Sequence, residues 1–176
     1  MQILLIRSLL SLLVFPTATA LAQTVAPVNL GSVINTEARD AEPTFTPDGV
    51  TMYFNCFDRE GEEGSDICVS HRDGADWSEP TIVWEVSTRE HLEVEPLLSP
   101  DGQQLYIMSN RPGGKGGMDI WVSDLVDGNW TSPRNLDGPI NSAYADHCLY
   151  FAGDEWETAY WTSTRPGGFG GNDIWT

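Results

Sequence analysis

Two arginines and two aspartates recur beside glycine-rich loops and are the residues best suited to bind a ligand. Arg111 and Arg165 precede these loops, and Asp119 and Asp173 follow them. A guanidinium group offers a planar fork that suits a carboxylate, so the four residues form the candidate ligand-binding set. Their recurrence also favours a structural role, in which each arginine pairs with the local aspartate and the aspartate accepts hydrogen bonds from the loop amides.

The histidines and the third cysteine form no recognisable metal-binding pattern. His71, His91 and His147 lack the partner spacing of a zinc motif. Asp146, His147 and Cys148 supply three ligand types in succession, but consecutive residues of a strand point to opposite faces. The sequence therefore predicts neither a bound metal nor a cofactor.

Catalytic groups are equally hard to find. The sequence holds no Gly-x-Ser-x-Gly motif, and its 26 acidic residues make any single carboxylate pair uninformative. Residues 113–117 (GGKGG) lead into a strand pattern, whereas a phosphate loop leads into a helix. Tryptophans recur at fixed places, Trp121 with Trp175 and Trp77 with Trp130, which favours a core role over sugar binding. We therefore expect no catalytic residues and a protein that is not an enzyme.

An internal repeat must position these groups. Residues 42–49 (EPTFTPDG) are answered by residues 95–102 (EPLLSPDG) with a shift of 53. Residues 109–121 (SNRPGGKGGMDIW) are answered by residues 163–175 (STRPGGFGGNDIW) with a shift of 54. Recurrence at this period is typical of proteins built from stacked supersecondary units.

Each unit predicts four short antiparallel strands, because apolar clusters of strand length are bounded by proline, glycine and aspartate and no helical periodicity is present. The fold class is therefore all-β, with about three propeller blades. The predicted blades span approximately residues 37–88, 89–141 and 142–176. Residues 27–36 resemble residues 133–142, so residues 25–34 are expected to complete the last blade as its outer strand and to close the ring.

The Ser/Thr-Pro-Asp-Gly turn and the glycine-rich motif of residues 109–121 resemble the WD-type propeller repeats of the TolB-like family. The resemblance covers residues 27–176. It implies a periplasmic or secreted propeller that serves as an interaction surface. Relatives of this kind sometimes precede OmpA-type peptidoglycan-binding domains, and no such second domain is expected here.

The number of repeats departs from the usual propeller, which has 4 to 8 blades. We expect a fragment of a longer propeller. Two alternatives remain open: two chains that complete one six-bladed ring by exchanging their end strands, or an open stack of three blades.

The first residues predict export. Arg7 precedes the apolar run 9–15, and residues 20–22 (ALA) fit a signal-peptidase site. Residues 1–22 are thus the expected signal peptide, residues 23–176 the repeat domain, and no membrane insertion is expected. The net charge of −17 disfavours nucleic acid and anionic lipid as partners.

Three cysteines are an odd number for an exported chain. Cys56 and Cys68 flank one loop and could pair across neighbouring strands if their geometry permits. Cys148 is then expected to be a small buried apolar residue.

These observations favour a noncatalytic scaffold, periplasmic or secreted, that binds a protein, peptide or cell-wall component. A homodimer formed by strand exchange is compatible with it. The alternatives are a carbohydrate-active lyase or hydrolase of propeller fold, and a structural segment of a larger envelope protein.

Overall fold

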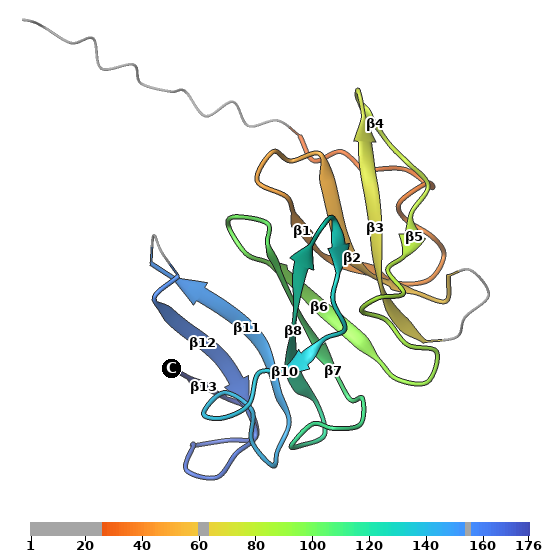
Figure 1. The fold of residues 1–176 in the computed structure, drawn as a ribbon. Helices are drawn as coiled ribbons and strands as arrows, with labels where there is room; N and C mark the ends of the chain where they lie inside the picture. The colour runs from red at the N-terminus through yellow and green to blue at the C-terminus, as the bar shows by residue number, and fades with distance from the viewer. Residues whose placement is uncertain (1–25, 60–63, 154–155) are drawn as a thin grey trace, which may run out of the picture.

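Three antiparallel β-sheets lie side by side in the order in which the chain forms them (Figure 1). The computed structural model describes residues 26–59, 64–153 and 156–176. The expected signal peptide, residues 1–22, lies outside the described residues. Within the described ranges the chain is all-β, and no helix there has the length and apolar character needed to cross a membrane.

The first sheet contains three long strands, β1 (Asp40–Phe45), β2 (Thr51–Phe57) and β3 (Ser65–Asp73). Two short strands, β4 (Asp76–Trp77) and β5 (Thr81–Ile82), both pair with β3. The fourth strand expected from the sequence is therefore two short pieces along one edge.

The second sheet repeats this arrangement. Its long strands are β6 (Glu93–Leu98), β7 (Gln104–Ser109) and β8 (Asp119–Val126). The short strands β9 (Asn129–Trp130) and β10 (Arg134–Asn135) both pair with β8.

The third sheet has three strands, β11 (Asp146–Ala152), β12 (Thr158–Ser163) and β13 (Asp173–Trp175). Strand β12 lies between the other two. In the part of the chain that the structure describes, no strand extends this sheet beyond β13.

The Pro-Asp-Gly turns join the first and second strands of the first two sheets. Asp48 accepts a hydrogen bond from the Thr46 hydroxyl at 2.6 Å, and Asp101 accepts one from the Ser99 hydroxyl at 2.6 Å. The glycine that ends each turn needs a positive φ, which is 70° at Gly49. The repeated turn residues of the sequence thus form the same hydrogen bond in both sheets.

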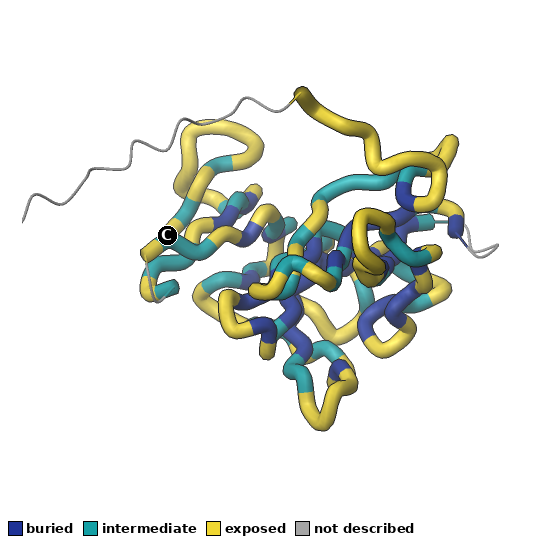
Figure 2. The backbone as a smooth tube through the Cα atoms, turned by 90° about the horizontal axis from the view of Figure 1, so that it is seen from above, coloured by how far each residue is buried: buried dark blue, intermediate teal, exposed yellow. Residues whose placement is uncertain are grey.

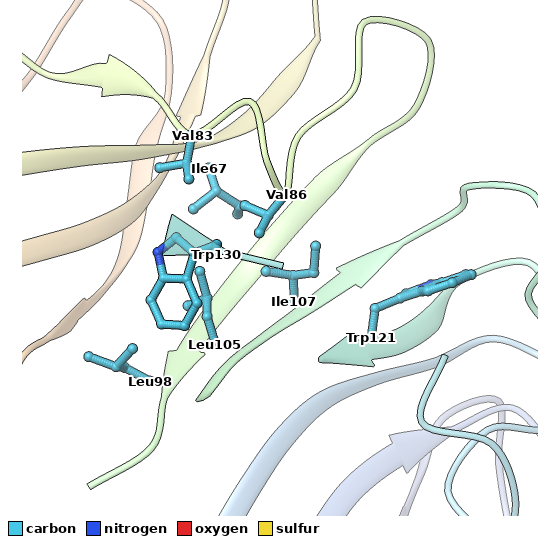
Figure 3. Packing of buried hydrophobic residues seen from close by; sticks show 8 residues of the cluster. All are labelled: Ile67, Val83, Val86, Leu98, Leu105, Ile107, Trp121 and Trp130. Atoms are coloured by element: carbon cyan, nitrogen blue, oxygen red, sulfur yellow. The ribbon is translucent and has the colours of Figure 1, made fainter. Parts of the chain in front are cut away.

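The main apolar core lies between the first and second sheets (Figure 3). Trp121 and Trp130 are 5% and 8% exposed there, so the core role predicted for these two tryptophans is confirmed. The Trp130 indole NH donates to the Tyr53 hydroxyl at 3.2 Å, which joins the two sheets. The cluster consists of Ile67, Val83, Val86, Leu98, Leu105, Ile107, Trp121 and Trp130.

The N-terminal segment packs on the first sheet. Ile34 is 4% exposed and lies in one cluster with Met52 and Phe54. Residues 26–39 form no strand. Among the described residues, the pairing expected between residues 25–34 and the last sheet is therefore not formed within the chain. The segment instead buries Ile34 against the first sheet.

Cys56 and Cys68 form a disulfide, with a Cα–Cα distance of 5.8 Å. Both are buried in the cluster that holds Ile34. The pairing that the sequence left open is thus present, and it links β2 to β3.

Candidate functional site

Arg111, predicted as a ligand-binding residue, is engaged in a buried ion pair. Its guanidinium contacts the Glu93 carboxylate at 2.9 Å, and the Glu93 side chain is fully buried. The same group donates to the Val86 carbonyl, and its Nε donates to the Ser109 hydroxyl at 3.1 Å. Arg111 therefore connects Val86, in the segment that joins the first and second sheets, to Glu93 of β6 and Ser109 of β7.

An arginine that binds both a buried carboxylate and a backbone carbonyl, which we call the arginine clamp, recurs in the other two sheets. Arg165 contacts Asp146 at 2.7 Å and donates to the Ile140 carbonyl. Arg59 contacts Asp40 at 3.0 Å and donates to the carbonyl of Ile34. Arg59 was not among the predicted residues, because the Pro-Gly-Gly motif that follows the other two arginines is absent after it. An arginine shortly after the second strand of each unit is the signal that would have found it.

The predicted partners of the arginines were wrong, whereas the predicted acceptor role of the aspartates is confirmed. Asp119 accepts hydrogen bonds from the amides of Lys115 and Gly116, and Asp173 accepts them from two amides of the equivalent loop. A Cβ added at Gly114 would lie 2.0 Å from the Asp119 carboxylate, so this close approach requires glycine. Each of the four predicted ligand-binding residues therefore has a contact that supports the scaffold.

Asp146 and Asp40, the carboxylates that pair with Arg165 and Arg59, make the fold sensitive to acid. Burial raises the pKa of Asp146, but hydrogen bonds from Ser163, Arg165 and Ser142 outweigh this effect and leave the pKa below its ordinary value of 3.8. Asp40 has a lowered pKa for the same reasons, with hydrogen bonds from Thr36 and Arg59 outweighing burial.

A carboxylate whose pKa is lowered by folding contributes its full stabilisation when the pH is above the pKa it has in the unfolded chain. This stabilisation is lost as the pH falls through the folded-state pKa. We expect the urea midpoint to be steady down to about pH 4, near the ordinary pKa of an aspartate, and to fall as the pH is lowered further. Asp146→Asn should lower the midpoint at neutral pH and flatten its fall in acid, whereas the exposed control Asp76→Asn should do neither. An acid limb unchanged in Asp146→Asn would contradict the assignment.

A β-bulge recurs in the first strand of each sheet. Glu42, Glu95 and Cys148 occupy equivalent positions and have positive φ values of 58°, 54° and 53°. The pairing register shifts at each of them. The Glu42 carboxylate accepts the Glu95 amide at 3.1 Å, and the Glu95 carboxylate accepts the Cys148 amide at 2.7 Å. The three bulges therefore form a continuous row that links the sheets.

The bulge brings His147 and Cys148 together, although strand alternation predicted that they would diverge. His147 Nδ1 lies 3.3 Å from Cys148 Sγ, and Glu95 Oε1 lies 3.5 Å from the same sulfur. Cys148 is a free, exposed thiol, so its predicted burial was wrong. The backbone at φ 53° breaks the two-residue alternation that the prediction assumed.

The surroundings of Cys148 disfavour its negatively charged form. Burial raises the pKa of the thiol, a hydrogen bond from Thr162 lowers it, and the charges of Glu95 and Glu42 raise it further. The net shift is upward.

No known family model matches the sequence, and no curated protein matches it either.

An aromatic hollow of about 410 Å³ lies between the second and third sheets. Phe151 and Trp156 stack on each other with ring centroids 4.6 Å apart, and Tyr106 packs against Phe151 at 5.2 Å. A sugar ring would stack on a free aromatic face, and Phe151 and Trp156 each use one face on the other. The hollow therefore resembles inter-sheet packing more than a carbohydrate subsite.

Proposed function

We propose that the three sheets are blades of an exported β-propeller scaffold of the TolB-like type, which acts by binding and not by catalysis. The partner we propose is a second copy of the chain, seated on the outer face of the third sheet. This face carries Tyr150, Tyr160, Thr162 and Ile174, which we call the open face.

The register defines the open face. Tyr150 pairs with Tyr160, and Thr162 pairs with Ile174, so the four side chains lie on one side of the sheet. The opposite side packs against the second sheet through Trp161 and its neighbours.

The observation that carries the proposal is the burial of the equivalent residues elsewhere. Ile67 and Ile120 occupy the place of Ile174 in the first two sheets and are fully buried. Ile174 itself is 77% exposed, and Tyr150 is also exposed. Figure 2 shows buried segments gathered in the middle of the molecule, while the end near the C-terminus is largely exposed or intermediate. An apolar face of this kind marks a contact with another protein.

The other end of the molecule offers a complementary surface. Val28, Leu30 and Val33 are exposed beside the first sheet, where Ile34 is already packed. The open face of one chain can therefore meet the N-terminal segment of another, and two such contacts would close a ring of six sheets. Burial at both ends would cover the apolar side chains that are exposed on the first and third sheets.

The cellular setting follows from the sequence. The signal peptide expected at residues 1–22 and the resemblance to TolB-like repeats support a periplasmic or secreted location. In that setting the completed ring would present its loops to a further protein, peptide or cell-wall component.

Light scattering of the purified mature chain, with small-angle X-ray scattering for shape, tests the proposal. We expect the mass of two chains and a ring-like profile. Ile174→Asp should give the mass of one chain, because a carboxylate buried without a partner is costly. The matched control Val126→Asp lies at the exposed end of β8, away from the open face, and should leave the mass of two chains unchanged. A wild-type mass of one chain, unaltered by Ile174→Asp, would refute the second copy as partner.

A further inference from the structure

We propose that Glu95, His147 and Cys148 bind a divalent transition-metal ion, with zinc the best match, at the junction of the second and third sheets. One carboxylate oxygen, one imidazole nitrogen and one sulfur lie within 4.8 Å of one another. Thiolate and imidazole are ligands that zinc prefers, and a carboxylate completes sets of this kind.

The spacing of the ligand atoms matches a tetrahedral ion. With Zn–S of about 2.3 Å and Zn–N or Zn–O of about 2.0–2.2 Å, ligand atoms around a tetrahedral zinc are about 3.3–3.6 Å apart. Cys148 Sγ lies 3.3 Å from His147 Nδ1 and 3.5 Å from Glu95 Oε1. Two of the three ligand separations thus have tetrahedral values, and the third, between His147 and Glu95, is within 4.8 Å, so the side chains would close on the ion when it binds.

Neighbouring groups orient two of the ligands. His147 Nε2 donates to Asn172 Oδ1 at 3.2 Å, which leaves the lone pair on Nδ1, the nitrogen that lies 3.3 Å from Cys148 Sγ and 3.2 Å from the Thr162 hydroxyl. The Thr162 hydroxyl also contacts the His147 carbonyl at 3.1 Å, so it keeps a partner when Nδ1 binds the ion. Glu95 Oε2 is held by the Cys148 amide at 2.7 Å, which leaves Oε1 beside the sulfur. Hydrogen-bonded partners of this kind orient ligands at metal sites.

The equivalent junction between the first two sheets serves as an internal comparison. Glu42 there contacts the Glu95 amide as Glu95 contacts the Cys148 amide. The residue that corresponds to His147 is Val94, and the one that corresponds to Cys148 is Glu95. The bulge row therefore forms without metal ligands, and the imidazole and thiol are additions specific to the second junction.

The exposure of Cys148 leaves the ion accessible to water. Cys148 is exposed, so solvent can supply a fourth ligand. Three protein ligands and one water constitute an open zinc site. The ion would also join β6 to β11 across the two sheets.

Cobalt titration of the full mature chain, with Cys148 kept reduced under anaerobic conditions, tests the site. We expect one Co²⁺ per chain, with tetrahedral d–d absorption and a thiolate-to-cobalt charge-transfer band, and displacement of the cobalt by Zn²⁺. Cys148→Ser should abolish the charge-transfer band. His147→Ala and Glu95→Gln should each weaken Zn²⁺ binding at least about tenfold in calorimetry.

Two further variants separate a built site from a thiol that binds metal alone. Asn172→Ala removes no ligand and should weaken binding about 10–100-fold through loss of orientation. His71→Ala removes an exposed imidazole from β3 and should change nothing. Thermal midpoints of the metal-free variants verify that they fold. Absence of stoichiometric binding, or equal affinity in His147→Ala, Glu95→Gln and wild type, would overturn the proposal.

Discussion

Arg111→Ala is expected to lower the free energy of unfolding by about 3–5 kcal/mol, since removal of one partner leaves a buried charge uncompensated. The Glu93 side chain is fully buried and Arg111 is 11% exposed, so solvent cannot replace the lost guanidinium. The variant also loses the hydrogen bond to the Val86 carbonyl. Urea denaturation followed by tryptophan fluorescence measures the change.

Two controls locate the effect. Arg39→Ala removes an ion pair in which the Arg39 side chain is 61% exposed, and it should cost less than about 1 kcal/mol. Arg111→Lys keeps the charge but loses the fork and should fall between the two. A cost in Arg111→Ala no larger than that in Arg39→Ala would show that the clamp does not stabilise the fold.

Removal of the Cys56–Cys68 disulfide should have the next largest effect. The bridge joins residues 12 apart in sequence, and closing a loop of that length stabilises a fold by about 3 kcal/mol through the unfolded state. Cys56→Ala combined with Cys68→Ala should therefore lower the melting temperature by roughly 6–12 °C in calorimetry.

Cys148→Ala supplies the matched control for the disulfide. It removes an exposed cysteine that lies outside the bridge, so the metal-free melting temperature should change little. Equal melting temperatures for the double variant and wild type would mean that the bridge constrains little in the unfolded chain.

Much of the fold could be predicted because the repeat is written in residues with strong local preferences. Proline, aspartate and glycine specify the turns, and their equivalents make equivalent hydrogen bonds in the structure. The recurrent tryptophans predicted the core between the sheets. The aspartate–amide contacts of the glycine loops were also predictable, since glycine at position 114 permits the approach.

The bulge row could not be predicted, and the candidate metal site depends on it. Positive φ at Glu42, Glu95 and Cys148 occurs in residues that rarely adopt it, so composition gives no signal. The predicted partners of Arg111 and Arg165 were wrong for a related reason. Arg111 and Asp119 are close in sequence, whereas the true partner, Glu93, is brought close by its pairing with Ser109 across β6 and β7.

The row of bulges also gives the stack a direction. Each carboxylate holds the amide of the sheet that follows it, first at Glu95 and then at Cys148. Cys148 itself offers a sulfur, which is a weak acceptor and a poor substitute for a carboxylate. A sheet packed against the third would gain apolar contacts without a carboxylate–amide bond like those at Glu95 and Cys148. Docking at that end should accordingly be reversible and dependent on concentration, while the two internal junctions stay closed.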